Sequence, residues 1–142
     1  MSKVLIAEDN PVNRELLREL LETRGYTIEE ACNGQEALDI IERTSPDILL
    51  LDLDMPVLDG FATVRRIRDN PRYASLPVLA VTAFAMQGDR EKVLAADFDG
   101  YLSKPIHAGK LLQEIERFLR GRGNQPSRDT KARAAAANGK SK

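Results

Sequence analysis

Residues 48–60, ILLLDLDMPVLDG, decide the fold that this chain is predicted to adopt. Four apolar residues in succession run directly into Asp52. A short apolar run bounded by polar and turn-forming residues is typical of a strand buried on both faces, as in parallel sheets covered by helices. Such sheets bind their ligands at the carboxyl ends of the strands. Asp52, at the end of this predicted strand, is therefore the first candidate for chemistry.

Four other segments are predicted to be strands, of which VLIA after Lys3 and LPVLAVT at residues 76–82 repeat the apolar pattern, and apolar residues at helical spacing separate them. The helices are predicted to start at Asn10, which caps Pro11 in the first helical position, at Asp59 and at Asp89. Five strands that alternate with five helices indicate an α/β fold, a doubly wound parallel sheet in a three-layer sandwich. The four other strands are predicted at residues 3–7, 26–31, 76–82 and 100–103.

The composition indicates one globular domain. The chain has 142 residues, of which 42% are hydrophobic and 30% charged, as is ordinary for a domain of this size. The sequence has no apolar run of bilayer length, and the few apolar residues after Lys3 are too short for a signal peptide, so we expect a cytoplasmic protein without a membrane segment. Cys32 is the one cysteine; it excludes an internal disulfide, and we expect a small buried side chain there.

Charge divides the chain into two regions. Residues 1–120 carry 15 basic and 21 acidic side chains, whereas residues 121–142 carry 6 basic and 1 acidic. The second region loses the apolar periodicity and is predicted to be a flexible basic tail after a domain of residues 1–120. An acidic body disfavours nucleic acid as the main ligand, because the phosphate backbone requires a positive surface.

Polar residues follow four of the five predicted strands. Glu8 and Asp9 come after the first strand, Asp52 after the third, Thr82 after the fourth and Lys104 after the fifth. Since the carboxyl ends of parallel strands share one edge of the sheet, these side chains are expected to converge. Clustered carboxylates repel one another and favour an oxygen-seeking cation such as Mg²⁺. With a lysine and a threonine nearby, the pattern predicts phosphoryl chemistry in which an aspartate oxygen attacks in line.

Each of these residues also has a purely structural interpretation. Asp9 suits a helix cap, Thr82 a β strand, and Lys104 a solvated loop. The Asp54 side chain is expected either to face the site or to face solvent, and its backbone carbonyl is available to a metal in both cases. The spacing of Asp52 and Asp54 also fits a rival class, the aspartate-nucleophile phosphatases, although those enzymes place the nucleophile strand near the amino terminus. A third interpretation, a nucleotide-binding module, is disfavoured because the sequence has no glycine-rich phosphate-binding loop.

Over residues 1 to about 120 the chain resembles the response-regulator receiver domains of two-component signalling. The resemblance implies a flavodoxin-like fold with strand order 2-1-3-4-5. The segment at residues 83–89, AFAMQGD, is similar to single-domain receivers of the chemotaxis and cell-cycle type. The motifs that carry the resemblance are Glu8-Asp9, Asp52, Pro56, Gly60, Thr82 and Lys104-Pro105.

The resemblance implies a phosphoacceptor rather than an enzyme with its own substrate. Asp52 would accept a phosphoryl group from a phosphohistidine on a sensor kinase or a histidine phosphotransfer protein. The metal ligands for Mg²⁺ would be Asp9, Asp52 and the backbone carbonyl of Asp54, with Glu8 acting through water. Thr82 and Lys104 would contact phosphoryl oxygens.

The resemblance also implies a switch and its partners. Thr82 and Tyr101 would transmit phosphorylation to a surface at residues of about 83–107, where a downstream protein binds. The expected state is a monomer or a weak homodimer that dephosphorylates itself. No DNA-binding output domain is expected, because only low-complexity residues follow Arg120.

Overall fold

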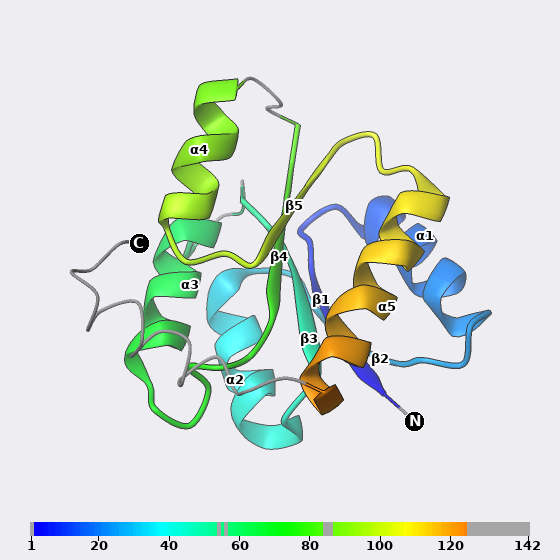
Figure 1. Cartoon of the computed structure of the whole chain (residues 1–142), viewed down its shortest axis with the longest axis horizontal. Coiled ribbons are helices and arrows are strands. Elements are labelled where there is room, and N and C mark those ends of the chain that lie inside the picture. Colours follow the sequence, from blue (N-terminus) through cyan, green and yellow to red (C-terminus); the bar gives the residue numbers. More distant parts are fainter. Residues whose placement is uncertain (1, 54, 56, 84–86, 125–142) are drawn as a thin grey trace.

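The computed structural model describes residues 2–53, 55, 57–83 and 87–124. Its centre is a parallel sheet with the strand order β2-β1-β3-β4-β5, which confirms the predicted flavodoxin-like order. Helices cover both faces of the sheet (Figure 1). In chain order the elements are β1 (Lys3–Ala7), α1 (Pro11–Glu22), β2 (Thr27–Ala31), α2 (Gly34–Thr44), β3 (Ile48–Asp52), α3 (Gly60–Asp69), β4 (Val78–Thr82), α4 (Gln87–Ala95), β5 (Gly100–Ser103) and α5 (Ala108–Asn124).

The sheet separates two apolar clusters. On one face, Leu50 and its neighbours pack with α1 and α5 through residues such as Leu21 and Ile115. On the other face, Leu49 and Leu51 pack with α2, α3 and α4. Every residue of β3 and β4 is buried, which explains why those strands are continuous apolar runs rather than alternating ones.

The structure confirms two of the predicted helix caps and corrects the third. The Asn10 side chain accepts hydrogen bonds from the amides of Val12 and Asn13, and the Asp59 side chain accepts one from Ala62. Helix α4 starts at Gln87, so Asp89 lies inside its first turn instead of capping it. An aspartate is favoured both at a cap and in the first turn, where it meets the positive end of the helix dipole, and the sequence pattern does not separate the two positions.

Other predicted boundaries change by a few residues. Strand β2 starts at Thr27 and β4 at Val78, and helix α5 continues to Asn124, past Arg120. Cys32 is exposed, so the prediction of a buried cysteine was wrong. The residue lies beyond the end of β2, in the connection that leads to the helix cap Asn33, where no second layer covers it. In the described part of the chain, no helix is long and apolar enough to cross a membrane.

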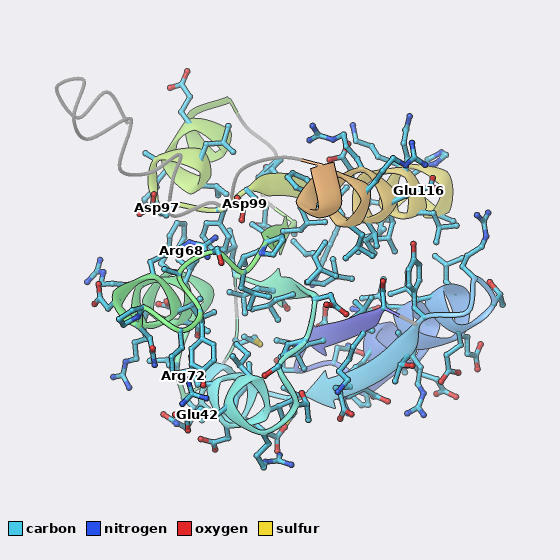
Figure 2. All side chains as sticks on the ribbon, turned by 60° about the horizontal axis from the view of Figure 1, so that its bottom comes forward. Glu42, Arg68, Arg72, Asp97, Asp99 and Glu116 are labelled. Atoms are coloured by element: carbon cyan, nitrogen blue, oxygen red, sulfur yellow. The ribbon has the colours of Figure 1, made fainter. Side chains whose placement is uncertain are left out.

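Arg68 on α3 ties together the edge of the sheet at which β4 and β5 start. Its guanidinium donates hydrogen bonds to the carbonyl oxygens of Leu76 (2.7 Å) and Asp97 (2.9 Å) and to Oδ2 of Asp99 (2.8 Å). The same carboxylate oxygen accepts the Val78 amide at 2.8 Å. Figure 2 shows Arg68 directed toward Asp97 and Asp99. Both members of this ion pair are only 10% exposed, so it fixes α3 against the sheet on the side away from the strands' carboxyl ends.

Candidate functional site

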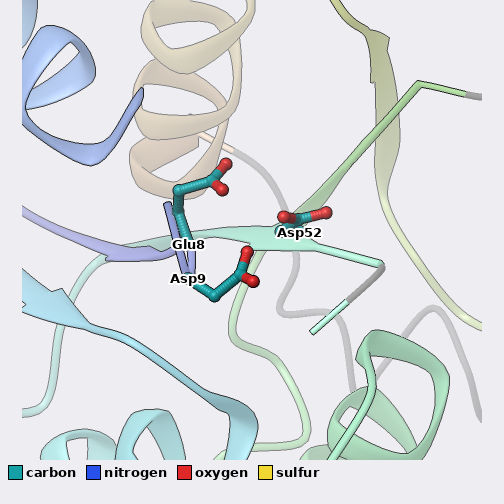
Figure 3. Close-up of side chains that lie close together, drawn as sticks. All are labelled: Glu8, Asp9 and Asp52. Carbon is teal, nitrogen blue, oxygen red and sulfur yellow. The ribbon is translucent and has the colours of Figure 1, made fainter. Parts of the chain in front are cut away.

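Three carboxylates meet at the carboxyl ends of β1 and β3. The two strands are parallel neighbours with Ala7 opposite Leu51, so the residues that follow, Glu8 and Asp52, lie side by side. Ligand oxygens of Glu8, Asp9 and Asp52 all fall within 4.8 Å of one another. Figure 3 shows the three side chains gathered where these strands end. The predicted convergence of these carboxylates is therefore present.

The three carboxylates differ in burial. Glu8 is 2% exposed and Asp52 is 3% exposed, whereas Asp9 is exposed. Burial raises the pKa of the Glu8 carboxyl, and the negative charge of Asp52 raises it further, although the Asn10 amide and Lys104 oppose this rise. Holding two carboxylates out of water so close together stores electrostatic repulsion, which a bound cation relieves.

Lys104 supplies the positive charge of the site. Its Nζ atom lies 3.3 Å from Oε1 of Glu8 and 3.3 Å from Oδ2 of Asp52. Burial lowers the pKa of this ammonium group, but the carboxylates of Asp52 and Glu8 raise it, and the net shift is upward. Lys104 therefore stays charged at neutral pH. Its backbone amide donates to the Thr82 carbonyl at 2.8 Å, which ties the lysine to the end of β4.

Thr82 lies on β4 and Tyr101 on β5, at the opposite side of the sheet from β2. Thr82 is the buried last residue of β4 and pairs in register with Ser103, while Tyr101 pairs with Ala80. Side chains alternate along strands, so Tyr101 shares the α4 face with Ala80 and Thr82. Tyr101 is partly buried and packs against the cluster formed with α2, α3 and α4. Asp54 and Pro56 lie outside the described residues.

Gly60 brings the start of α3 against the strand that carries Asp52. Its amide donates to the Leu53 carbonyl at 3.1 Å. A β-carbon at this position would lie 2.7 Å from the Leu53 α-carbon and 2.9 Å from the Asp52 carbonyl oxygen, closer than real contacts allow. Only glycine permits this approach of backbone to backbone, which explains the Asp-Gly pair at the end of the predicted loop.

Arg14 is a residue near the site that sequence reasoning missed. It donates from Nη1 to the backbone carbonyl of Glu8 at 2.7 Å. No signal in the sequence predicts this contact, since Arg14 and Arg18 both lie on α1 and nothing in their spacing distinguishes one from the other. Only the path of the chain between β1 and α1 brings Arg14 to the Glu8 carbonyl.

The arrangement suits phosphoryl transfer chemically. Its donor atoms are carboxylate oxygens, which Mg²⁺ prefers and which it binds singly or in pairs while keeping several waters. A buried aspartate beside a permanently charged lysine provides a nucleophilic oxygen and a partner for the developing negative charge.

The model of the family described as "Response regulator receiver domain" matches residues 4–116. The chain belongs to this family of two-component phosphoacceptor proteins. The family is one of signalling domains rather than of phosphatases, so the rival interpretation loses its support.

Three relatives illustrate the relationship. The polar-differentiation response regulator DivK of Brucella anthropi is 38% identical over 116 residues, which are 82% of this chain and 94% of DivK. The receiver domain of sensor histidine kinase PA1611 from Pseudomonas aeruginosa, solved with a magnesium ion coordinated in its active-site cleft, superposes with a TM-score of 0.77 at 36% identity and covers 83% of this chain and 97% of its own. The receiver domain of Ssk1 from Saccharomyces cerevisiae, solved with the histidine phosphotransfer protein Ypd1, gives a TM-score of 0.80 at 29% identity, covering 85% of this chain and 90% of the matched chain.

Proposed function

We propose that Asp52 is the phosphoacceptor of this receiver domain and that its donor is a phosphohistidine on a sensor kinase or a histidine phosphotransfer protein. The observation that carries the proposal is the position of the Asp52 carboxylate, buried at the end of β3 with Lys104 Nζ 3.3 Å from Oδ2. The Ssk1 relative, which was solved with a histidine phosphotransfer protein, supports the donor class. A cytoplasmic location stays our prediction.

In the proposed reaction, an Asp52 oxygen attacks the phosphorus atom of the donor. The new P–O bond forms as the P–N bond breaks, and the donor imidazole nitrogen keeps the electron pair and takes up a proton. Lys104 is already charged and moves from its two carboxylates to a phosphoryl oxygen, while the Thr82 hydroxyl donates to another. In the later hydrolysis of the phosphoryl group, water attacks phosphorus as the P–O bond to Asp52 breaks, which releases inorganic phosphate and regenerates the Asp52 carboxylate.

Glu8, Asp9 and Asp52 are the proposed residues for Mg²⁺, with the backbone carbonyl of Asp54 as a further predicted ligand. The all-oxygen donor set within 4.8 Å fits the preference of this ion, and the magnesium-containing relative PA1611 supports the assignment. A bound Mg²⁺ would neutralise charge on the oxygens of the transferring group. Asp9 is exposed and can exchange water for metal without rearrangement of the core.

The proposed output is a change of the surface around α4, β5 and α5, which a downstream protein reads. A phosphoryl group adds nearly two negative charges and three acceptor oxygens; it would draw the Thr82 hydroxyl inward and leave space for Tyr101 to rotate. Addition of a beryllofluoride mimic is expected to shift the backbone amide signals of residues 83–107. Unchanged signals there would refute this output surface. A monomer or weak homodimer stays our prediction for the assembly.

The donor is proposed to dock on the exposed start of α1. Val12 is 64% exposed and Leu16 60% exposed, one turn apart on the helix that begins directly after Asp9. Large apolar side chains at such exposure are suited to a protein contact. A histidine phosphotransfer protein, such as the one solved with the Ssk1 relative, is a partner of the right chemistry for this surface. The helix starts two residues after Asp9, whose ligand oxygen lies within 4.8 Å of one of Asp52.

Labelling from a small-molecule phosphodonor tests the proposed function. Wild type, Asp52→Asn and Asp59→Asn are incubated with acetyl phosphate in Mg²⁺ or in chelator. Asn caps helices as well as Asp does, so Asp59→Asn is a matched control for removal of one carboxylate. We expect one phosphoryl group per chain in wild type and in the control, only with Mg²⁺, and none in Asp52→Asn. Labelling of Asp52→Asn would refute the assignment, and steady turnover of p-nitrophenyl phosphate would favour the phosphatase interpretation.

A further inference from the structure

We infer that Arg14 is a positioning residue that holds the Asp9 backbone in place for the metal ion. The inference rests on the proposed function, because it presumes that Glu8, Asp9 and Asp52 bind Mg²⁺. Arg14 lies on α1, and its side chain is 20% exposed. Its Nη1 atom donates to the Glu8 carbonyl at 2.7 Å, and its Nε atom donates to Oε1 of Glu30 at 3.0 Å.

The two peptide groups that flank Asp9 are each held by one hydrogen bond. The peptide before Asp9 contains the Glu8 carbonyl, which accepts from Arg14. The peptide after Asp9 contains the Asn10 amide, which donates to Oε2 of Glu8 at 3.1 Å. Asp9 itself is exposed, so packing does not determine where its α-carbon lies. Arg14 and the Glu8 carboxylate together therefore determine how the Asp9 side chain leaves the backbone.

Glu30 makes Arg14 a rigid support. It lies on β2 opposite Ile6 of β1, and the Glu8 amide donates to the Ala31 carbonyl next to it at 3.0 Å. The guanidinium is a planar fork that bonds the strand carboxylate and the loop carbonyl at the same time, which a lysine ammonium on a flexible stem does not reproduce. Arg14 thus connects the sheet to the peptide before Asp9.

If Arg14 acts only through its charge, its removal would change the Mg²⁺ affinity in the opposite direction from that expected if it holds the backbone in place. A cationic side chain near a metal site repels the metal, so loss of its charge alone would tighten Mg²⁺ binding. Loss of the support frees the peptide before Asp9 and weakens Mg²⁺ binding, since residues that orient metal ligands contribute to affinity. The direction of the change in affinity therefore decides between the two roles.

Arg18 offers a matched control. It lies one turn farther along α1, and its Nη1 atom also pairs with Glu30. Within the described residues its guanidinium pairs with Glu22 and Glu30, whereas the Glu8 carbonyl accepts from Arg14. Arg14→Met and Arg18→Met each remove one positive charge and one partner of Glu30. Only the first removes the hydrogen bond to the metal-ligand loop.

The experiment titrates metal-free wild type, Arg14→Met and Arg18→Met with Mg²⁺, followed by calorimetry and by backbone amide spectra. We expect the Mg²⁺ Kd of Arg14→Met to rise about tenfold, the lower end of the range for residues that orient metal ligands, and that of Arg18→Met to change less than about twofold. In acetyl phosphate labelling, Arg14→Met should need more Mg²⁺ for half-maximal rate but reach a near wild-type rate at saturation. Its Asp9 and Asn10 amides should exchange faster with solvent in the absence of metal.

Two results would overturn the inference while the proposed function stands. These are an unchanged or tighter Mg²⁺ Kd in Arg14→Met, and an equal weakening in both variants. Thermal melting of both variants is measured in the same buffer. A general folding defect is recognised by an equal fall in melting temperature in Arg14→Met and Arg18→Met, or by loss of the folded amide spectrum. Absence of saturable Mg²⁺ binding by wild type would overturn the inference and the proposed function together.

Discussion

Lys104 lies between Glu8 and Asp52 and balances the charge of these two buried carboxylates. Its ammonium group stands 3.3 Å from each of them. The topology of the sheet explains why the convergence of the strand-end residues was predictable from sequence. In a parallel sheet the carboxyl end of every strand faces the same edge, so identification of the strands sufficed to bring Glu8, Asp52, Thr82 and Lys104 together. The position of Arg14 depends on side-chain reach, which no sequence spacing encodes.

Glu8→Gln is expected to stabilise the metal-free protein at neutral pH. The pKa of Glu8 in the folded state lies above its ordinary value, chiefly because of burial, and that shift already includes the attraction of Lys104. A carboxyl with a raised folded pKa contributes stability that is fully present below the ordinary pKa of about 4.5 and is lost as the pH rises through the folded pKa. Glutamine carries no charge and escapes this loss, while its amide oxygen still accepts the Asn10 hydrogen bond.

Urea unfolding in chelator, repeated across the pH range, measures the effect. The difference in free energy of unfolding between Glu8→Gln and wild type should grow as the pH rises above about 4.5 and should be small below it. A difference that is largest in acid would contradict the account of a buried, repelled carboxylate.

Helix α2 packs against α3 through a glycine. A β-carbon on Gly34 would overlap the Leu58 carbonyl oxygen and the Thr63 hydroxyl. The Leu58 oxygen belongs to the backbone, so it cannot move aside as a flexible side chain would. We expect Gly34→Ala to lower the free energy of unfolding by about 2 kcal/mol, in the range of overpacked cores.

Gly109 on α5 is the control for this substitution. A β-carbon there has no neighbour within 4 Å, and alanine forms helices better than glycine by about 1 kcal/mol. Gly109→Ala is therefore expected to be neutral or stabilising in the same urea series. Equal effects of the two substitutions would show that the α2–α3 contact tolerates a side chain.

The ion pair of Arg68 and Asp99 is expected to stabilise the packing of α3 against the edge of the sheet where β4 and β5 start. Asp99→Ala removes the ion pair with Arg68, whose side chain is only 10% exposed, and the hydrogen bond that the Val78 amide donates. We expect a loss of about 3 kcal/mol, as for other pairs broken from one side in a buried setting.

Glu116 provides the comparison on α5 (Figure 2). It pairs with Arg120 at 2.9 Å, but both side chains are more than 60% exposed, and such pairs contribute less than about 1 kcal/mol. Thermal melting of Asp99→Ala and Glu116→Ala in parallel separates the two cases. A loss in Asp99→Ala no larger than in Glu116→Ala would remove the buried pair from the account of stability.

At the scale of elements, the sequence predicted which segments form strands and helices and where the strands end, but not every strand start or helix boundary. The apolar periodicity that identifies α5 fades near Arg120, yet the helix continues to Asn124, because backbone hydrogen bonds propagate a helix past its last buried residue. The burial of Cys32 was mispredicted for a related reason. Residue type predicts burial only on average, and the connection between β2 and α2 has no layer above it.

At the scale of the whole molecule, the same edge of the sheet carries Asp52, the proposed phosphoacceptor, and the start of α1 with its exposed apolar side chains. Leu16→Glu is expected to slow transfer from a phosphorylated histidine phosphotransfer protein by tenfold or more, equivalent to about 1.4 kcal/mol of lost contact energy. Labelling by acetyl phosphate should be unchanged, because that donor needs no docking surface. Rapid-quench measurement with both donors gives the comparison.

Leu94 is the matched control, since it is an exposed leucine on α4, away from α1. Leu94→Glu should accept the phosphoryl group from the protein donor at the wild-type rate. If Leu16→Glu were equally unaffected, or if it lost labelling by acetyl phosphate as well, α1 would not be the docking surface for the donor.

The chemical location of the phosphoryl group tests the central claim most directly. Borohydride reduces an aspartyl phosphate to homoserine, so reduction of the phosphorylated protein followed by peptide sequencing by mass spectrometry identifies the modified residue. We expect homoserine at position 52 and nowhere else, in an amount that matches the phosphoryl group incorporated. Homoserine at Asp9 or Asp54, with Asp52 intact, would contradict it.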